Sequence, residues 1–110
     1  MTVSPSAAPS LTPWLSVLIP VYNVQDYLEE CVESVMAQWP TGDAAGQAIE
    51  VLLLDDCSTD GSASLMQALA ARWPGRLTLL RHAANVGLSA ARNTMIDAAR
   101  GDYLWFLDSD

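Results

Sequence analysis

Ile49-Glu-Val-Leu-Leu-Leu-Asp-Asp-Cys-Ser-Thr-Asp-Gly61 is the part of the sequence that most clearly indicates the architecture. Residues Ile49 to Leu54 form an almost continuous apolar run, which is typical of a strand covered on both faces. Asp55 to Gly61 are dense in Asp, Ser and Thr, which favour turns and helix caps. Ser62 to Trp73 then carry apolar residues at helical spacing, and Pro74-Gly75 ends that helix. The stretch predicts a buried strand, an acidic turn and a helix that Asp60 or Ser62 caps.

The same alternation continues on both sides of this stretch. Apolar, β-branched runs predict three more strands, and helical spacing predicts two more helices. Pro20 cannot donate to a sheet ladder, so the first strand is expected to end near it. The predicted strands are Leu15–Val21, Leu77–Arg81 and Tyr103–Leu107, and the predicted helices are Val24–Gln38 and Gly87–Ala99. This order predicts an α/β fold with a Rossmann-like, mostly parallel, doubly wound sheet.

Each predicted helix has one apolar face that we expect to cover the sheet. The four tryptophans are interpreted as core residues. The inward positions are Tyr27, Leu28, Cys31, Val32, Val35, Met36 and Trp39; Leu65, Met66, Leu69 and Trp73; and Leu88, Ala91, Met95, Ala98 and Ala99.

Composition limits the functional classes. The chain has 110 residues, of which 51% are hydrophobic and 16% charged, which is enough for one small domain with a core. A net charge of −8 argues against binding to a nucleic-acid backbone. Residues 1–13 are rich in Ser, Thr, Ala and Pro and predict a disordered leader. Cys31 and Cys57 lack metal-ligand spacing, which indicates reduced thiols and a cytoplasmic location.

Acidic residues gather where two predicted strands end. Five of the 13 acids lie there, and in parallel sheets ligands bind outside these strand ends. Crowding carboxylates without a cation is costly, and Asp-x-Asp after a strand suits Mg²⁺ or Mn²⁺; a solvated turn is the alternative. The five acids are Asp55, Asp56, Asp60, Asp108 and Asp110.

Several neighbouring residues fit a nucleotide. A carboxylate of the Asp55-Asp56 pair could accept a hydrogen bond from a nucleobase imide or a ribose hydroxyl. Tyr22 could stack on a base, or it could simply be a half-buried ring. Arg92, near a helix start, could meet a diphosphate, or it could form a surface salt bridge. His82 is interpreted as a surface residue at a strand end.

Four motifs together resemble the family 2 glycosyltransferases, nucleotide-sugar-dependent enzymes of the GT-A fold. The resemblance covers about 96 positions, and each motif alone is weak. The motifs are Ser16-Val-Leu-Ile-Pro-Val-Tyr-Asn23, Val51-Leu-Leu-Leu-Asp-Asp-Cys-Ser-Thr-Asp-Gly-Ser62, Asn85-Val-Gly-Leu-Ser-Ala-Ala-Arg-Asn93 and Leu107-Asp-Ser-Asp110.

The resemblance implies a role for each matching position. It implies that residues 14–110 are the donor-binding part of a GT-A domain, with a divalent metal, Mg²⁺ or Mn²⁺, on the donor diphosphate. The implied positions are Pro20 and Tyr22 at the nucleotide, with Tyr22 against the base; Asp55 and Asp56, of which Asp56 is favoured for the base; Ser58, Asp60 and Gly61 in the rest of that turn; Asn85, Gly87, Arg92 and Asn93 at the ribose and diphosphate; and Asp108 and Asp110 at the metal, which also touch the donor.

The implied reaction is transfer of a sugar from a nucleotide-diphosphate donor to a hydroxyl of a glycan, lipid or other acceptor, with inversion. The resemblance places the general base and the acceptor half beyond Asp110, so we expect this chain to bind the donor with little turnover. Gln25 stands where relatives often carry Glu, and the loop Pro40–Ala48 is longer than in many relatives. The last strand is expected to be an exposed edge that favours self-association.

Two other functions fit parts of the sequence. Leu107-Asp-Ser-Asp110 superficially matches the nucleophile motif of haloacid-dehalogenase-like phosphatases, but that motif normally opens the fold. Asp55-Asp56 could form the acidic pocket of a receiver-like signalling module, but such modules need a late Lys and this chain has none.

Overall fold

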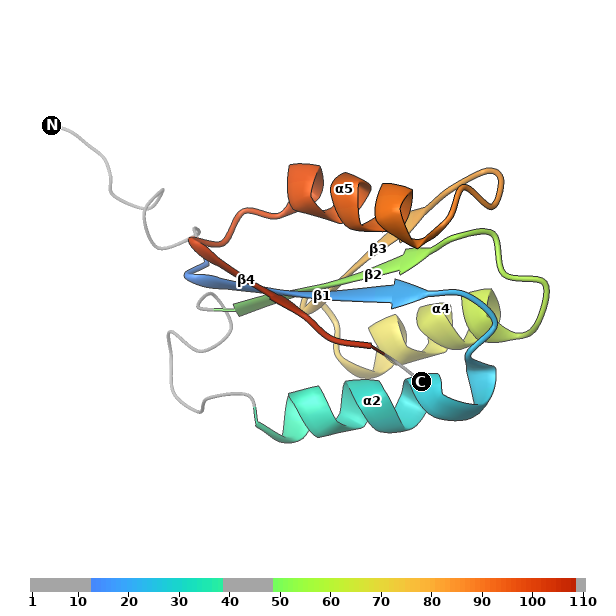
Figure 1. Cartoon of the computed structure of the whole chain (residues 1–110). Helices are drawn as coiled ribbons and strands as arrows, with labels where there is room; N and C mark the ends of the chain where they lie inside the picture. Colours follow the sequence, from blue (N-terminus) through green and yellow to red (C-terminus); the bar gives the residue numbers. More distant parts are fainter. Residues whose placement is uncertain (1–12, 39–48, 109–110) are drawn as a thin grey trace, which may run out of the picture.

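A computed structural model of the chain describes residues 13–38 and 49–108 (Figure 1). A four-stranded parallel sheet has the order β3-β2-β1-β4. The elements in chain order are β1 (Leu15–Val21), α2 (Gln25–Ala37), β2 (Ile49–Asp55), α4 (Ser62–Arg72), β3 (Leu77–Arg81), α5 (Leu88–Ala98) and β4 (Tyr103–Phe106). The predicted α/β fold with a parallel, doubly wound sheet is confirmed, and every predicted element is present with its ends shifted by two residues at most.

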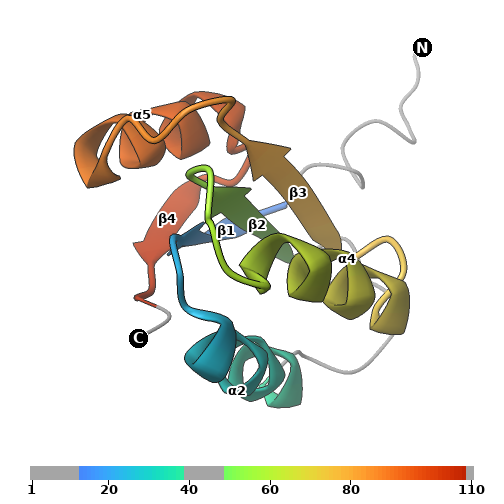
Figure 2. The same cartoon turned by 90° about the vertical axis from the view of Figure 1, so that its right-hand side faces the viewer.

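Helices cover the sheet from both sides. α5 lies on one face, and α2 and α4 lie on the other (Figures 1 and 2). Because side chains alternate along a strand, Val17, Ile19 and Val21 pack toward α2 and α4. Leu18 between them packs toward Ala91 and Met95 of α5. The continuous apolar runs of β1 and β2 are thus explained by burial on both faces.

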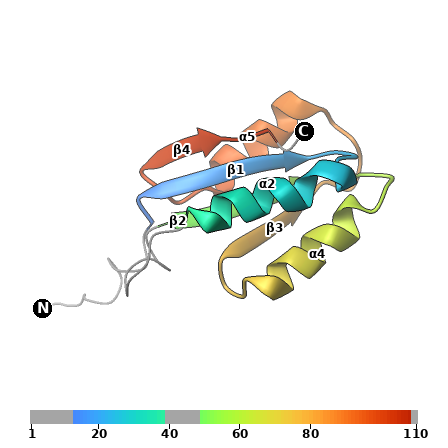
Figure 3. The ribbon, with the colours of Figure 1, turned by 90° about the horizontal axis from the view of Figure 1, so that it is seen from below.

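The two helices on the same face are also joined to each other. Figure 3 shows α2 and α4 side by side beneath the sheet. Arg72 near the end of α4 forms ion pairs with Glu29 and Glu33 of α2, each at 2.9 Å. The negative charge of these two α2 side chains is therefore partly neutralised by the neighbouring helix.

Some of the residues predicted to face the sheet are exposed, so these predictions are wrong. Tyr27 is 55% exposed because the buried stripe of α2 is narrower and runs through Leu28, Val32, Val35 and Met36. Ala98 is exposed because α5 contacts the sheet through Ala91 and Met95. Leu88 is 51% exposed because it opens into the cleft described below.

The tryptophans are not uniformly core residues. Trp73 packs partly against the core, whereas Trp14 and Trp105 are 48% and 43% exposed. Within the described residues β4 pairs with β1 alone, so one of its edges is open, and the predicted exposed edge is present. The strand β1 also continues through Pro20, which stands in register with Leu54 one residue before the strand ends.

A buried polar network fastens the start of β4, at the end of the sheet away from the predicted nucleotide residues. Glu50 is only 7% exposed, and its Oε2 accepts hydrogen bonds from Ser16 Oγ and from the Arg100 N–H, both at 2.6 Å. The Gly101 N–H donates to Ser16 Oγ at 2.8 Å. A Cβ at Gly101 would lie 2.6 Å from the Ser16 nitrogen, so this close approach requires glycine.

Some predictions fall on residues that the structure does not describe. They are the leader of residues 1–13 apart from Pro13, the loop Pro40–Ala48, Trp39 and Asp110. Among the described residues, no helix is long and apolar enough to cross a membrane.

Candidate functional site

A cleft of about 530 Å³ lies at the carboxyl end of the sheet. It is bounded by the ends of β1 and β2, by the first turn of α5 and by Asp108, two residues after the end of β4. Its lining residues are Pro20, Val21, Tyr22, Val24, Asp56, Asn85, Gly87, Leu88, Ala91 and Asp108. This is the edge where ligands bind in open α/β sheets, and the volume is in the range of small-molecule sites.

Six of the residues predicted at the nucleotide-sugar donor line this cleft: Pro20, Tyr22, Asp56, Asn85, Gly87 and Asp108. They come from four separate segments that only the fold brings together. Tyr22 is 46% exposed, so its ring is accessible to a ligand in the cleft. Leu88 and Val24 also line the cleft, and sequence reasoning did not find them.

Asp55 and Asp56 point to opposite sides of the sheet. Asp55, 1% exposed, accepts a hydrogen bond from the Ser58 N–H at 2.9 Å. Its other oxygen lies 3.8 Å from Arg81 Nε and, among the described residues, has no hydrogen-bond partner. Asp55 belongs to a separate hollow beside Met66 of α4, so only Asp56 of the pair reaches the cleft.

Asp56 fastens the loop that leads into α5. Its Oδ1 accepts hydrogen bonds from the Val86 N–H at 3.1 Å and from His82 Nδ1 at 2.9 Å. Its Oδ2 accepts from the Gly87 N–H at 2.9 Å. Burial by itself raises the pKa of Asp56, but the bonds from His82, Val86 and Gly87 outweigh it and hold the pKa below its usual value. The carboxylate at the cleft is therefore ionised and acts as an acceptor.

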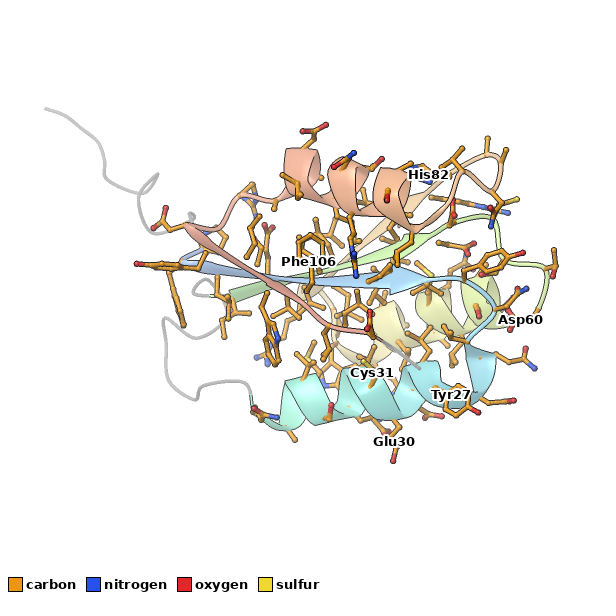
Figure 4. All side chains as sticks on the ribbon, in the orientation of Figure 1. Tyr27, Glu30, Cys31, Asp60, His82 and Phe106 are labelled. Atoms are coloured by element: carbon orange, nitrogen blue, oxygen red, sulfur yellow. The ribbon has the colours of Figure 1, made fainter. Side chains whose placement is uncertain are left out.

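His82 is not the surface residue that the sequence predicted. Its side chain is 17% exposed and bridges Asp56 to Thr94 of α5, with Nε2 at 2.9 Å from Thr94 Oγ1. Figure 4 shows His82 at the α5 side of the molecule. The partners lie 26 and 12 residues away, so no local pattern marks this contact.

The turns after β1 and β2 are joined by hydrogen bonds. Asn23 Oδ1 accepts from the Thr59 N–H at 2.8 Å, and the Asn23 N–H donates to Ser58 Oγ at 3.0 Å. The Val24 N–H donates to Ser62 Oγ at 3.0 Å. Asn23 has φ 53°, a left-handed conformation that Asn tolerates well. These bonds fix Tyr22 at the cleft wall.

The remaining residues of the acidic turn serve the same junction. Asp60, labelled in Figure 4, accepts from the Ser62 N–H at the start of α4 at 2.9 Å, and its other oxygen accepts from the Gln25 N–H. Asp60 therefore bonds the first N–H of α4 from the position before the N-cap; the N-cap itself is Gly61, which makes no side-chain bond. Gln25 Oε1 in turn accepts from the Gly61 N–H. The structure gives Ser58, Asp60 and Gly61 a role in holding the two turns together.

Two residues predicted at the diphosphate lie beside the cleft and not in its lining. Arg92 of α5 is exposed, and its guanidinium carbon is 5.6 Å from the centre of the Phe106 ring (Figure 4 labels Phe106). Phe106 is two residues before Asp108, so Arg92 lies near the same strand end. Asn93 is exposed on the same helix.

Asp108 is the described member of the predicted metal pair. It is exposed on the cleft wall, and its carbonyl oxygen lies 3.8 Å from the thiol of Cys31. Carboxylate oxygen is the donor that Mg²⁺ and Mn²⁺ prefer, and Mg²⁺ often takes only one or two carboxylates, with phosphates and water completing its shell. Asp108 therefore fits such an ion. Within residues 13–38 and 49–108, no cluster of three His, Cys, Asp or Glu residues could hold a metal.

Both cysteines are free, in agreement with the predicted reduced thiols. The pKa of the Cys31 thiol is raised by burial and, to a lesser extent, by the charge of Asp108. A thiol with a raised pKa is a poor nucleophile. The site thus consists of an open aromatic ring, one ionised acceptor and one carboxylate suited to a hard cation.

Comparison with known proteins gives one consistent match. Residues 16–110 match the model of the family described as glycosyl transferase family 2. The chain is 39% identical over 100 residues to the uncharacterized glycosyltransferase EpsJ of Bacillus subtilis, covering 91% of this chain and 27% of EpsJ. These matches argue against the phosphatase and signalling alternatives.

Solved structures agree. A mannosyltransferase, PcManGT from Pyrobaculum calidifontis, in complex with GDP-Man and Mn²⁺ superposes with a TM-score of 0.78 at 30% identity, over 93% of this chain and 29% of that protein. TarS 1-349 of S. aureus in complex with UDP-GlcNAc gives a TM-score of 0.75 at 30% identity, over 87% of this chain and 26% of that one. The chain spans about a quarter of the length of these proteins.

Proposed function

The chain belongs to glycosyl transferase family 2, and on that premise we propose that its cleft binds the nucleotide-diphosphate sugar donor of a glycosyl transfer reaction. One observation carries the proposal: six residues predicted at the donor, from four separate segments, line a single cleft at the carboxyl end of the sheet. Further support comes from the similar structures that contain GDP-Man or UDP-GlcNAc.

Each wall of the cleft suits one part of the donor. The accessible ring of Tyr22 can stack on the nucleobase, and the ionised Asp56 can accept a hydrogen bond from a base N–H. Asn85 and Gly87 lie on the side that closes over the ribose and diphosphate, with Arg92 nearby as a guanidinium partner for phosphate. Asp55 contributes to the fold of the strand end instead of touching the donor.

Asp108, together with Asp110, would hold a Mg²⁺ or Mn²⁺ ion at the diphosphate. Such an ion supplies neutralisation of the charge that develops on the leaving nucleoside diphosphate. The Mn²⁺ in the similar mannosyltransferase complex supports this assignment. Cys31 contacts Asp108 only through the backbone carbonyl, so the Asp108 carboxylate is left for the ion.

The reaction proposed for the whole protein is a direct displacement with inversion at the sugar. An acceptor hydroxyl of a glycan, lipid or other compound attacks the anomeric carbon, a carboxylate base takes its proton, and the nucleoside diphosphate leaves. The chain spans about a quarter of the length of the similar proteins, and we propose that it supplies the donor-binding part of this reaction.

Isothermal titration of the chain with UDP and with GDP, each with and without Mn²⁺, tests the proposal. We expect one nucleotide to bind, and to bind more tightly with Mn²⁺. Glu50→Gln is the matched control, because Glu50 lies at the opposite end of the sheet. Absence of binding under all conditions, in a sample whose circular dichroism shows a folded chain, would rule out the proposal.

Two further proposals follow from the sequence. The open edge of β4, with the exposed side chains of Tyr103, Leu104 and Trp105, supports self-association through strand pairing. Light scattering that gives only the monomer mass of 11.8 kDa at high concentration would contradict it. The free thiols of Cys31 and Cys57 support a cytoplasmic location, which fractionation of the producing cells would test.

A further inference from the structure

His82 connects three parts of the site that are separate in the sequence. Its backbone N–H donates to the Asp55 carbonyl at 2.9 Å, which anchors the residue at the end of the sheet. Its ring then reaches Asp56 through Nδ1 and Thr94 of α5 through Nε2, both at 2.9 Å. The imidazole is thus fixed at both nitrogens.

The two hydrogen-bond partners of the ring define which nitrogen carries the proton in neutral His82. An ionised carboxylate can only accept hydrogen bonds, so Nδ1 must carry the proton that faces Asp56. In the neutral ring Nε2 is then an acceptor, and the hydroxyl of Thr94 donates to it. The same order of groups activates nucleophiles in hydrolases, but Thr94 is not among the residues that line the cleft. We therefore interpret the two ring hydrogen bonds of His82 as holding Asp56 and not as activating the hydroxyl of Thr94.

The two oxygens of the Asp56 carboxylate accept different numbers of hydrogen bonds from the described residues. Oδ1 accepts from both His82 and Val86, whereas Oδ2, among the residues that the structure describes, accepts only from Gly87. Each carboxylate oxygen has about two acceptor positions, so Oδ1 is full and Oδ2 keeps one. Because Asp56 lines the cleft, this remaining position is available to a bound ligand.

We propose that His82 is a positioning residue for the nucleotide: by occupying Oδ1 of Asp56, it directs the remaining acceptor position of Oδ2 to the nucleobase. This inference rests on the proposed donor binding. Loss of the Nδ1 bond would let the carboxylate rotate about its own axis and would loosen the Val86–Gly87 amides. Loss of the bond from Nε2 to Thr94 would leave the Asp56 carboxylate held by Nδ1 of His82.

Two substitutions separate these bonds. In His82→Asn the side-chain amide can take the place of Nδ1 and keep the bond to Asp56. In His82→Gln the longer side chain can reach Thr94 but no longer presents a donor at the Nδ1 position. Each variant loses one hydrogen bond of the bridge. A merely structural role predicts that both variants lose thermal stability while their dissociation constants for the nucleotide remain equal.

The test measures dissociation constants for UDP and GDP with Mn²⁺ by isothermal titration. We expect His82→Gln to bind about tenfold more weakly and His82→Asn to stay within about threefold of the unsubstituted chain, since the bond lost to a charged group is the stronger one. Glu50→Gln should lower thermal stability without changing the dissociation constant, which controls for general destabilisation.

The outcomes distinguish the two proposals. Equal binding by both His82 variants overturns the positioning role while leaving donor binding in place. If the unsubstituted chain binds neither nucleotide, donor binding fails and the role of His82 fails with it. An independent measurement is the imidazole ¹⁵N spectrum of the free chain: a protonated Nδ1 is expected, and a protonated Nε2 with a bare Nδ1 overturns the assignment.

Discussion

Replacing Asp56 by Asn should destabilise the fold far more than the same replacement at its neighbour Asp55. Asp56 accepts three hydrogen bonds, from His82, Val86 and Gly87. The Asn oxygen can still accept two of them, but the amide group would face the third donor. A hydrogen bond to a charged group contributes about 1.5–3 kcal/mol, so the lost bond and the opposed donors together should cost about 2–4 kcal/mol.

Asp55→Asn is the matched control. Asp55 uses one oxygen for the Ser58 N–H, and its other oxygen has no hydrogen-bond partner among the described residues, so an amide there opposes no donor. Only the long contact to the exposed Arg81 is lost, and such pairs contribute about 0–1 kcal/mol.

Urea unfolding followed by tryptophan fluorescence measures both variants. The account predicts a clear drop in the unfolding midpoint for Asp56→Asn and a change within about 1 kcal/mol for Asp55→Asn. Equal losses, or a larger loss at Asp55, would refute the assignment of the two carboxylates to opposite faces.

Three further predictions concern the same framework. Gly101→Ala should cost about 1–3 kcal/mol in urea unfolding because its Cβ would meet the backbone of Ser16, and an unchanged free energy of unfolding would contradict this. Asn23→Ala should lower the free energy of unfolding by about 1–3 kcal/mol through loss of the acceptor that joins the two turns, and an unchanged free energy of unfolding would contradict this role. The pKa of Asp56 is lowered from 3.8 in the folded chain. The stabilisation that its carboxylate contributes is therefore present above pH 3.8 and is lost as the pH falls through the folded-state pKa. Acid titration should show a shallower loss of stability in Asp56→Asn than in the unsubstituted chain, and identical slopes would contradict the assignment.

The order of elements could be predicted because each run carries its own period. The β2 run is apolar at every position from Val51 to Leu54, and both faces of that strand are indeed buried. Two-residue alternation places Asp55 on the side of Val51 and Leu53, toward α4, and leaves Asp56 to the other side. The sequence therefore held the signal that separates the two acids, although the resemblance had treated them as a pair.

Other features depend on partners distant in the sequence. His82 looked like an isolated polar residue because Asp56 and Thr94 approach it only in the folded chain. Glu50 is buried and accepts a hydrogen bond from the N–H of Arg100, fifty residues away, in a network that no local pattern indicates. The exposure of Trp105 follows from the position of β4 at the edge of the described sheet, which depends on strand order rather than on composition.

We propose that the cleft between the ends of β1, β2 and β4 and the start of α5 is the donor site. The most direct measurement is ¹⁵N-resolved NMR of the chain titrated with Mn²⁺ and UDP or GDP, because the paramagnetic ion broadens the amide signals nearest to it. We expect Mn²⁺ to broaden the amide signals of Asp108 and Gly87 when the nucleotide is present and not when it is absent. The amide signals of Glu50 and Gly101, at the far end of the sheet, should be unaffected. Broadening centred on the far end, or none at Asp108 with either nucleotide, would contradict it.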